Sequence, residues 1–210
     1  MHVCTFAGHS FVFSATVEER LKDEIETYLA DIDEASFYVG GRGEFDGMAA
    51  SAVRSAKARR AVVETACTLV GKVTYFWGGK SLVIGWDSRW RQLQRVWAGG
   101  NSTTGTYRPF GLDCSGFVDW TFYNATLGAY VIGHGGGAIM QHNYCTSIPW
   151  SDALPGDLVF YPDDEHVGIV GGRDEAGNLL IIHCANSYNC VVITGLEGFT
   201  AIGRPVYYAE

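Results

Sequence analysis

A cysteine and two histidines have the residue types and the spacing needed for nucleophilic catalysis. Asp113 precedes Cys114, and apolar residues at helical spacing follow, so the pattern predicts a helix whose first turn holds the thiol. The dipole and unpaired N–H groups at a helix N-terminus favour a thiolate, and a neighbouring imidazolium favours it more strongly. Cys114 is therefore the candidate nucleophile, and it requires a histidine partner.

Two histidines in the C-terminal half are candidates for that partner. His166 and His183 flank a predicted hairpin, and a register that pairs Val170 with Leu179 places both imidazoles on one face of the sheet. A slip of one residue would separate them. We expect His166 to take the proton from Cys114 and hold an ion pair with it, and His183 to orient His166 by a hydrogen bond.

The elements around these residues predict helices followed by an antiparallel sheet. Residues 60–70 suit a helix buried on one side. Short β patterns separated by turns follow at residues 158–161, 167–170, 179–185, 191–194 and 205–208. This order predicts an α+β fold in which the nucleophile helix packs on one face of the sheet.

The first 58 residues show a different pattern of strand, helix, strand and helix. These elements are predicted at residues 3–7, 17–30, 37–39 and 45–58. The glycine-rich loop at 40–43 can hold a phosphate on backbone N–H groups, and it can equally serve as a tight turn.

Two motifs in this segment resemble the start of a SLOG-type Rossmann-like nucleotide-binding domain. They are CTFAGH at residues 4–9 and FYVGG at residues 37–41. We interpret residues 1–58 as a truncated half of such a domain, and a packing appendage without a ligand is the alternative.

The composition predicts a folded chain with no affinity for nucleic acid. Of its 210 residues, 47% are hydrophobic and 18% are charged, as is ordinary for a globular protein. The formal net charge of −8 argues against attraction to phosphate backbones. Neither an apolar run of about 20 residues nor an export signal is visible, so we expect no membrane span. Six cysteines without paired metal spacing predict mostly free thiols, with a bridge between Cys184 and Cys190 as the alternative, and we expect neither a metal nor a cofactor.

Five motifs in order resemble the NlpC-type papain-like cysteine peptidases. They are YFWGG at 75–79, DCSGF at 113–117, PGDLVF at 155–160, HVGI at 166–169 and IH at 182–183. The resemblance covers about residues 60–208, so we divide the chain into segments 1–58 and 59–210. A Trp- and Arg-rich insertion at 80–110 replaces the family's short link, and we expect it either to border a cleft or to pack as a partly helical segment.

The resemblance implies an activity and further site residues. It implies hydrolysis of peptidoglycan stem peptides, commonly between D-γ-glutamate and a diamino acid, through an acyl-enzyme on Cys114. It also implies that Tyr75 places its hydroxyl near the oxyanion, with a core aromatic as the alternative. Asp113, Ser115 and Asp157 fall at positions that line the pocket for a stem peptide's free amino group. A helix cap at Asp113 and a turn residue at Asp157 are the alternatives.

Two other functions remain open on the residues alone. Nucleophiles other than water can attack a thioester, so the same scaffold could act as an acyltransferase or amidase. A long apolar tunnel at the site would favour acyl transfer to a lipid. The chain could instead be a nucleotide-sensing or scaffold protein that binds phosphate at residues 40–43. The oligomeric state and the cellular location are not predicted.

Overall fold

The computed structural model describes residues 2–6, 8, 12, 16–30, 32, 35–41 and 43–209. Ala7, His9 and Arg42, which belong to the predicted N-terminal motifs and loop, lie outside the described residues. The chain divides into two units, Met1–Arg59 with Tyr208–Glu210, and Arg60–Tyr207.

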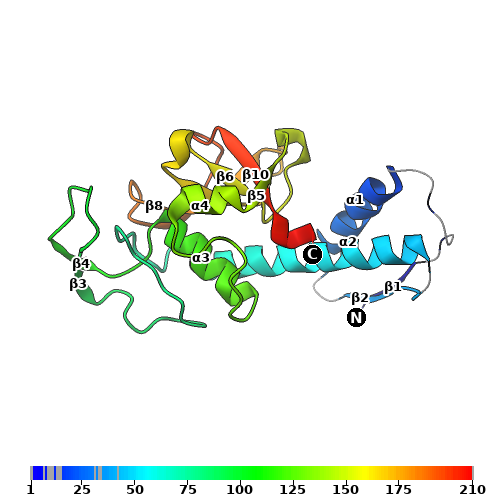
Figure 1. The fold of residues 1–210 in the computed structure, drawn as a ribbon, viewed down its shortest axis with the longest axis horizontal. Coiled ribbons are helices and arrows are strands. Elements are labelled where there is room, and N and C mark those ends of the chain that lie inside the picture. The colour runs from blue at the N-terminus through cyan, green and yellow to red at the C-terminus, as the bar shows by residue number, and fades with distance from the viewer. Residues whose placement is uncertain are drawn as a thin grey trace. The chain divides into compact units, whose positions relative to one another are not determined.

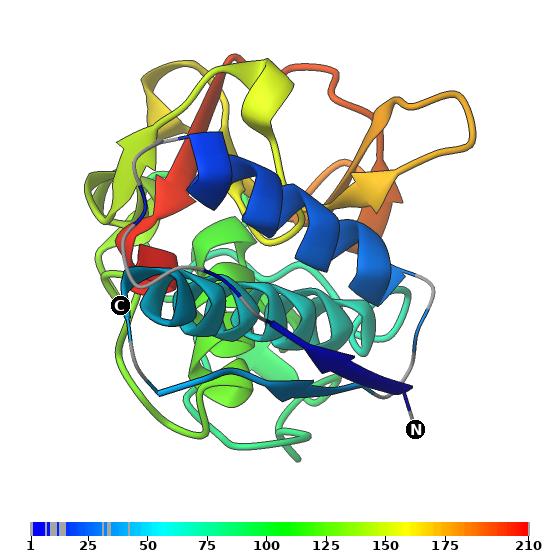
Figure 2. The ribbon, with the colours of Figure 1, turned by 90° about the vertical axis from the view of Figure 1, so that its right-hand side faces the viewer.

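The N-terminal unit contains two parallel strands and two helices. β1 (His2–Thr5) pairs in parallel with β2 (Ala35–Tyr38), and α1 (Thr16–Ala30) connects them (Figure 2). Ile25 of α1 packs with Ala52, Val53 and Ala56 of α2 (Glu44–Cys67) to form a small core. The strand–helix order matches the prediction, but two described strands fall short of a nucleotide-binding Rossmann-like sheet, and that resemblance is not confirmed.

One long helix replaces two that were predicted separately. Helices at 45–58 and 60–70 were expected, whereas α2 runs without interruption from Glu44 to Cys67. The sequence Lys57-Ala58-Arg59-Arg60-Ala61 contains no glycine or proline, and all of these residues are good helix formers, so nothing ends the helix there.

A six-stranded antiparallel sheet forms the centre of the second unit, with strand order β5-β10-β6-β7-β8-β9. The strands are β5 (Cys145–Ser147), β6 (Leu158–Phe160), β7 (Val167–Arg173), β8 (Leu179–Ala185), β9 (Cys190–Thr194) and β10 (Ala201–Pro205). The strand predicted at 205–208 is wrong: the strand ends at Pro205, and the 3-10 helix η3 (Val206–Ala209) follows. Proline lacks the N–H that would extend the ladder.

Helix α3 (Cys114–Ala125) packs against β7 and β8, and its Phe117 and Phe122 are fully buried. The shorter α4 (Gly137–Asn143) lies beside it (Figure 1). A cluster containing Val159, Val170 and Ile181 forms a further hydrophobic core on the sheet. The predicted α+β fold with the nucleophile helix on the sheet is confirmed. Two single-turn 3-10 helices, η1 (Trp150–Asp152) and η2 (Pro162–Asp164), connect the strands.

The insertion at 80–110 contains a hairpin and no helix. β3 (Leu93–Arg95) pairs antiparallel with β4 (Tyr107–Pro109), and Figure 1 shows this hairpin apart from the central sheet. The expected helical content is therefore wrong, because glycine, serine and threonine dominate residues 99–106 and favour turns. No helix in the described part of the chain is both long and apolar enough to cross a membrane.

Candidate active site

The structure places Cys114 at the first position of α3, where a nucleophile was predicted. Asp113 is the N-cap of this helix, and its Oδ1 accepts from the N–H of Gly116 at 2.6 Å. The cap role of Asp113 is therefore confirmed. Cys114 is buried, with 8% of its surface exposed, and its sulfur accepts from the N–H of Val167, the residue that follows His166. The thiol thus lies beside the backbone of the predicted base.

The two histidines form a direct hydrogen bond on one face of the sheet. Nε2 of His166 lies 2.7 Å from Nδ1 of His183. The predicted register is wrong by two residues, because Val170 pairs with Ile181 instead of Leu179. The observed pairing of β7 with β8 also contains an irregularity between Val170 and Gly172. A shift of two residues preserves the face to which each side chain points, so the convergence survives.

Gly168 makes room for the histidine pair. Continuing the observed register places Gly168 opposite His183, so His166 reaches His183 along the diagonal. A Cβ atom at Gly168 would lie 2.6 Å from Cγ2 of Ile181 and 3.2 Å from Cβ of His183. The missing side chain therefore permits the close approach.

Thr194 extends the histidine pair into a chain of three hydrogen-bonding side chains. Its hydroxyl donates to the carbonyl of Gly195 at 3.0 Å, so the same oxygen accepts from Nε2–H of His183, also at 3.0 Å. With its proton on Nε2, His183 accepts at Nδ1 from Nε2–H of His166. This arrangement leaves Nδ1 of His166 unprotonated and able to act as a base.

Burial sets the protonation states of these groups. Burial and then the Asp113 carboxylate raise the pKa of the Cys114 thiol to about 11, although the Val167 N–H and Lys80 oppose this. Burial and then the neighbouring His183 lower the pKa of His166 to about 4, and burial lowers the pKa of His183 to about 4. At neutral pH the thiol is protonated and both imidazoles are neutral. The predicted thiolate–imidazolium pair is therefore not the resting state of this structure.

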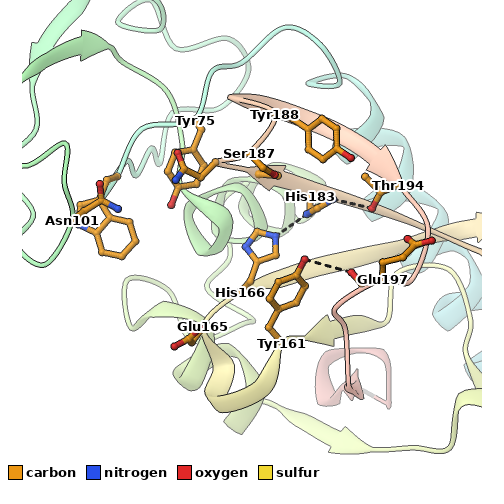
Figure 3. Close-up of a pocket in the computed structure, with 13 residues that line it drawn as sticks. Tyr75, Asn101, Tyr161, Glu165, His166, His183, Ser187, Tyr188, Thr194 and Glu197 are labelled. Atoms are coloured by element: carbon orange, nitrogen blue, oxygen red, sulfur yellow. Dashed lines mark hydrogen bonds between the residues drawn. The ribbon is translucent and has the colours of Figure 1, made fainter.

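A cavity of about 600 Å³ opens at the histidine pair, and we call it the histidine cavity. Figure 3 shows His166 and His183 in its wall together with Tyr75 and Thr194. The other lining residues are Trp77, Asn101, Tyr161, Glu165, Ala185, Asn186, Ser187, Tyr188 and Glu197. Of the lining side chains only Ala185 lacks a polar atom, and the charged members are two glutamates. Asn101 comes from the insertion, which therefore borders the cavity.

Lys80 occupies the position that the resemblance assigned to a substrate ammonium. Its Nζ lies 2.9 Å from Oδ1 of Asp113 and donates to Oγ of Ser115 at 2.5 Å. Neither Asp113 nor Ser115 lines the histidine cavity. Both are instead satisfied by an ammonium of the chain itself.

Asp157 does not line the histidine cavity either. Its carboxylate is fully buried and accepts from the backbone N–H of Leu154 at 2.9 Å and from Arg204 at 3.1 and 3.2 Å. The structure thus places Asp157 in the turn role that was the alternative to substrate binding.

Reasoning from the sequence missed Lys80, Thr194 and Gly168. Lys80 and Thr194 stand outside the five motifs, and each acts through a partner distant in the sequence. Gly168 stands in the HVGI motif, but its contact with His183 depends on the pairing of β7 with β8. No group of three or more His, Cys, Asp or Glu side chains suited to holding a metal ion occurs among the described residues. The six cysteines are free thiols.

Comparison with known proteins identifies relatives of the second unit. Residues 72–198 match the model of the NlpC/P60 family. Probable endopeptidases of Mycobacterium bovis and Mycobacterium tuberculosis are 32% identical over 119 residues, which cover 54% of this chain and 21% of theirs. The chain thus spans about a fifth of the length of these curated relatives.

Solved structures share the fold at low sequence identity. The P60 domain of antigen MAP1204 from M. avium subspecies paratuberculosis has a TM-score of 0.51 at 24% identity, covering 71% of this chain and 96% of that domain. The P60 domain of antigen MAP1272c from M. avium paratuberculosis has a TM-score of 0.53 at 17% identity, with 74% and 98% covered. The peptidoglycan hydrolase RipB of M. tuberculosis has a TM-score of 0.50 at 21% identity, with 90% and 83% covered.

Proposed function

The chain belongs to the NlpC/P60 family, and on that premise we propose that it is a cysteine endopeptidase that cuts peptidoglycan stem peptides. The single observation that carries this proposal is the hydrogen-bonded pair of His166 and His183 at a cavity, with the Cys114 sulfur beside the backbone of His166. The names of the relatives agree with it, since they include probable endopeptidases and a peptidoglycan hydrolase.

The proposed reaction begins with attack by sulfur on the scissile carbonyl carbon. The thiol proton passes to Nδ1 of His166 as the carbon–sulfur bond forms. Because the pKa values disfavour a preformed ion pair, we expect proton transfer to accompany the attack. His166 then gives this proton to the leaving amine, and water hydrolyses the thioester, which restores the thiol of Cys114.

Two donors are available for the oxyanion. The N–H of Cys114 stands at the first position of α3, where no intrahelical acceptor exists. Tyr75 lines the histidine cavity, and burial, followed by the charges of Cys114 and its neighbours, raises the pKa of its phenol. A phenol that stays protonated can donate to the developing negative charge.

Charge supports the proposed bond between D-γ-glutamate and a diamino acid. Glu165 and Glu197 are the charged residues of the cavity wall, and with neutral histidines they give the site a negative field. A diamino acid brings an ammonium that such carboxylates attract. The polar lining also disfavours the alternative of acyl transfer to a lipid.

A nucleotide-binding role finds little support in the N-terminal unit. The Asp46 carboxylate lies against the backbone of Gly40, where a Cβ atom would collide with it. A negative group at this position would repel a phosphate held by the loop. We therefore do not propose a nucleotide as ligand.

The proposal is tested by incubating the protein with purified muropeptides and analysing the products by mass spectrometry. The wild type and a Cys67→Ala control, which removes an exposed thiol, should cut. Cys114→Ala should not. Equal cutting by Cys114→Ala and wild type would end the proposal.

A further inference from the structure

The short helix α4 contacts both elements that carry the proposed catalytic pair. It packs against α3, whose first residue is the nucleophile Cys114, and against η2, the 3-10 turn that precedes His166. The consecutive residues Gln141 and His142 of α4 make side-chain hydrogen bonds to these two elements. Neither residue lines the histidine cavity, so α4 would act on the reaction through the elements that it holds.

Gln141 holds the end of α3 that carries the nucleophile. Its side chain is fully buried, and its Nε2 group donates to the carbonyl of Ser115 at 2.8 Å and to Oδ1 of Asp119 at 2.7 Å. Ser115 directly follows Cys114 in the first turn of α3. One amide therefore uses both of its protons to fix α4 against the start of the nucleophile helix.

His142 holds the segment that leads to the proposed base. Its Nδ1 lies 2.7 Å from Oδ1 of Asp164, and because an ionised carboxylate can only accept, Nδ1 is the donor. The imidazole ring also stacks on the fully buried ring of Phe160 in β6, with centroids 4.0 Å apart. The stack fixes the ring of His142, so the hydrogen bond fixes the position of Asp164.

We call residues 161–166 the base loop, because the segment ends at His166. The N–H of Tyr161 donates to the carbonyl of His166 at 3.0 Å and closes the loop at its two ends. Tyr161, Glu165 and His166 all line the histidine cavity (Figure 3). A movement of the base loop would therefore move the imidazole of His166 in the cavity wall.

The backbone of the base loop is strained at two consecutive residues. Asp163 has a φ of 56° and Asp164 a φ of 55°, both in the left-handed region that residues other than glycine adopt uncommonly. Strained backbone persists where the surrounding contacts over-determine it, and it concentrates at functional sites. The bond from His142 is such a contact, and it acts on the second of the two strained residues.

We propose that Gln141 and His142 are positioning residues, and that α4 is a bracket that sets the place of the His166 imidazole relative to the Cys114 sulfur. The inference rests on the proposed function, which makes these two groups base and nucleophile. Proton transfer between them needs a defined geometry, since a misplacement of about 1 Å can cost about a hundredfold in rate.

The protonation states of the pair increase the need for such a bracket. The raised pKa of the Cys114 thiol and the lowered pKa of the His166 imidazole keep both groups uncharged at neutral pH. No ion-pair attraction then draws the two side chains together. Their separation is left to the contacts that hold α3 and the base loop.

A matched pair of alanine variants isolates the bond to the base loop. Asp164→Ala and Asp163→Ala place the same side chain in the same left-handed conformation, but only the first removes the bond to His142. We expect kcat on muropeptides to fall about three- to tenfold in Asp164→Ala with KM little changed, and to stay at the wild-type value in Asp163→Ala. Asp164→Asn should restore kcat, because its side-chain oxygen accepts the same bond and asparagine tolerates this backbone. Equal losses in both alanine variants, or no rescue by asparagine, would overturn the inference.

A second readout needs no cleavage and therefore separates this inference from the peptidase proposal. The imidazole nitrogen signals of His166 are followed by NMR in the free protein. They should shift in Asp164→Ala and stay in place in Asp163→Ala. Unmoved signals in Asp164→Ala would overturn the bracket whether or not the wild type cuts muropeptides. Shifted signals in a wild type that does not cut would support the bracket and count against the peptidase proposal alone.

A double-mutant cycle tests whether α4 acts as one unit. Gln141→Met removes both bonds to α3 at similar volume, and His142→Phe keeps a ring on Phe160 but loses the bond to Asp164. If α4 links the helix to the base loop, breaking either end releases both, so the double variant should lose no more kcat than the weaker single variant. Denaturant unfolding of each variant restricts the comparison to folded protein. Additive losses would show two independent contacts and would overturn the bracket.

Discussion

Replacing Thr194 with valine should impair catalysis, because His183 would no longer be held in the tautomer that carries its proton on Nε2. Thr194 Oγ1 is the acceptor for Nε2–H of His183, and this bond keeps Nδ1 free to accept from His166. Valine has the same branched shape and suits a strand, and the backbone pairing of residue 194 with Ile181 is unaffected. The substitution therefore removes two hydrogen bonds, the one from His183 and the one to the carbonyl of Gly195, and little else.

The expected loss follows from the strength of the bond from His183. A hydrogen bond of this kind contributes about 0.5–1.5 kcal/mol net. Without it, the imidazole of His183 can carry its proton on Nδ1, where it opposes the N–H of His166 instead of accepting from it. We expect kcat/KM to fall about two- to tenfold, since about 1.4 kcal/mol corresponds to a factor of ten.

The assay compares Thr194→Val with Thr194→Ser on muropeptides, with denaturant unfolding measured in parallel. Serine keeps the hydroxyl and should retain kcat/KM close to wild type. Nitrogen NMR of the imidazoles should show a changed tautomer of His183 in the valine variant alone. Wild-type activity in Thr194→Val, or equal losses in both variants, would refute the tautomer argument.

Three further perturbations have defined outcomes. Gly168→Ala brings a methyl group 2.6 Å from Ile181, so it should cost about 1–3 kcal/mol of unfolding free energy and reduce kcat/KM; unchanged stability would contradict this packing. Arg204→Leu removes the cation that pairs with the buried Asp157 carboxylate and should lower the unfolding free energy by about 3 kcal/mol, while kcat/KM of the folded protein stays the same. Alkylation of Cys114 by iodoacetamide should still accelerate above pH 9, because burial raises the thiol pKa to about 11, and a plateau near neutral pH would contradict it.

The pH dependence of activity belongs with these predictions. The pKa of His166 is lowered to about 4, so the imidazole remains a neutral base until the pH approaches that value. We expect kcat/KM to be flat near neutrality and to fall as the pH drops toward 4, where His166 gains a proton. An acid limb centred near pH 6.5 would show an imidazole with its ordinary pKa instead.

Local signals in the sequence were enough to locate the nucleophile helix and the central strands. The polar residue before Cys114 and the apolar spacing after it predicted the capped helix, and the nearly continuous apolar run over residues 179–185 matched β8. Both depend on neighbours within a few residues. The face shared by the two histidines was also predictable, because a two-residue shift in pairing preserves it.

Features that depend on distant contacts were not predictable in this way. The ammonium of Lys80 reaches Asp113 across 33 residues, and no local pattern assigns it that partner. The pairing register was wrong because β7 continues past Val170 to Arg173, which pairs with Leu179. A one-residue shift between Val170 and Gly172 then places Val170 opposite Ile181, and a glycine in a strand does not reveal such a shift by itself. Burial raises the pKa of the Cys114 thiol and lowers the pKa of the His166 imidazole, and burial is a property of the whole fold.

The most direct measurement of the central claim is the mass of the enzyme during turnover. Acid quenching of a muropeptide digest, followed by proteolysis and mass spectrometry, should reveal an acyl group on the fragment that contains Cys114, equal in mass to the donor half of the cut peptide. Cys114→Ala should show neither this adduct nor products. Cutting by Cys114→Ala at the wild-type rate would contradict the account.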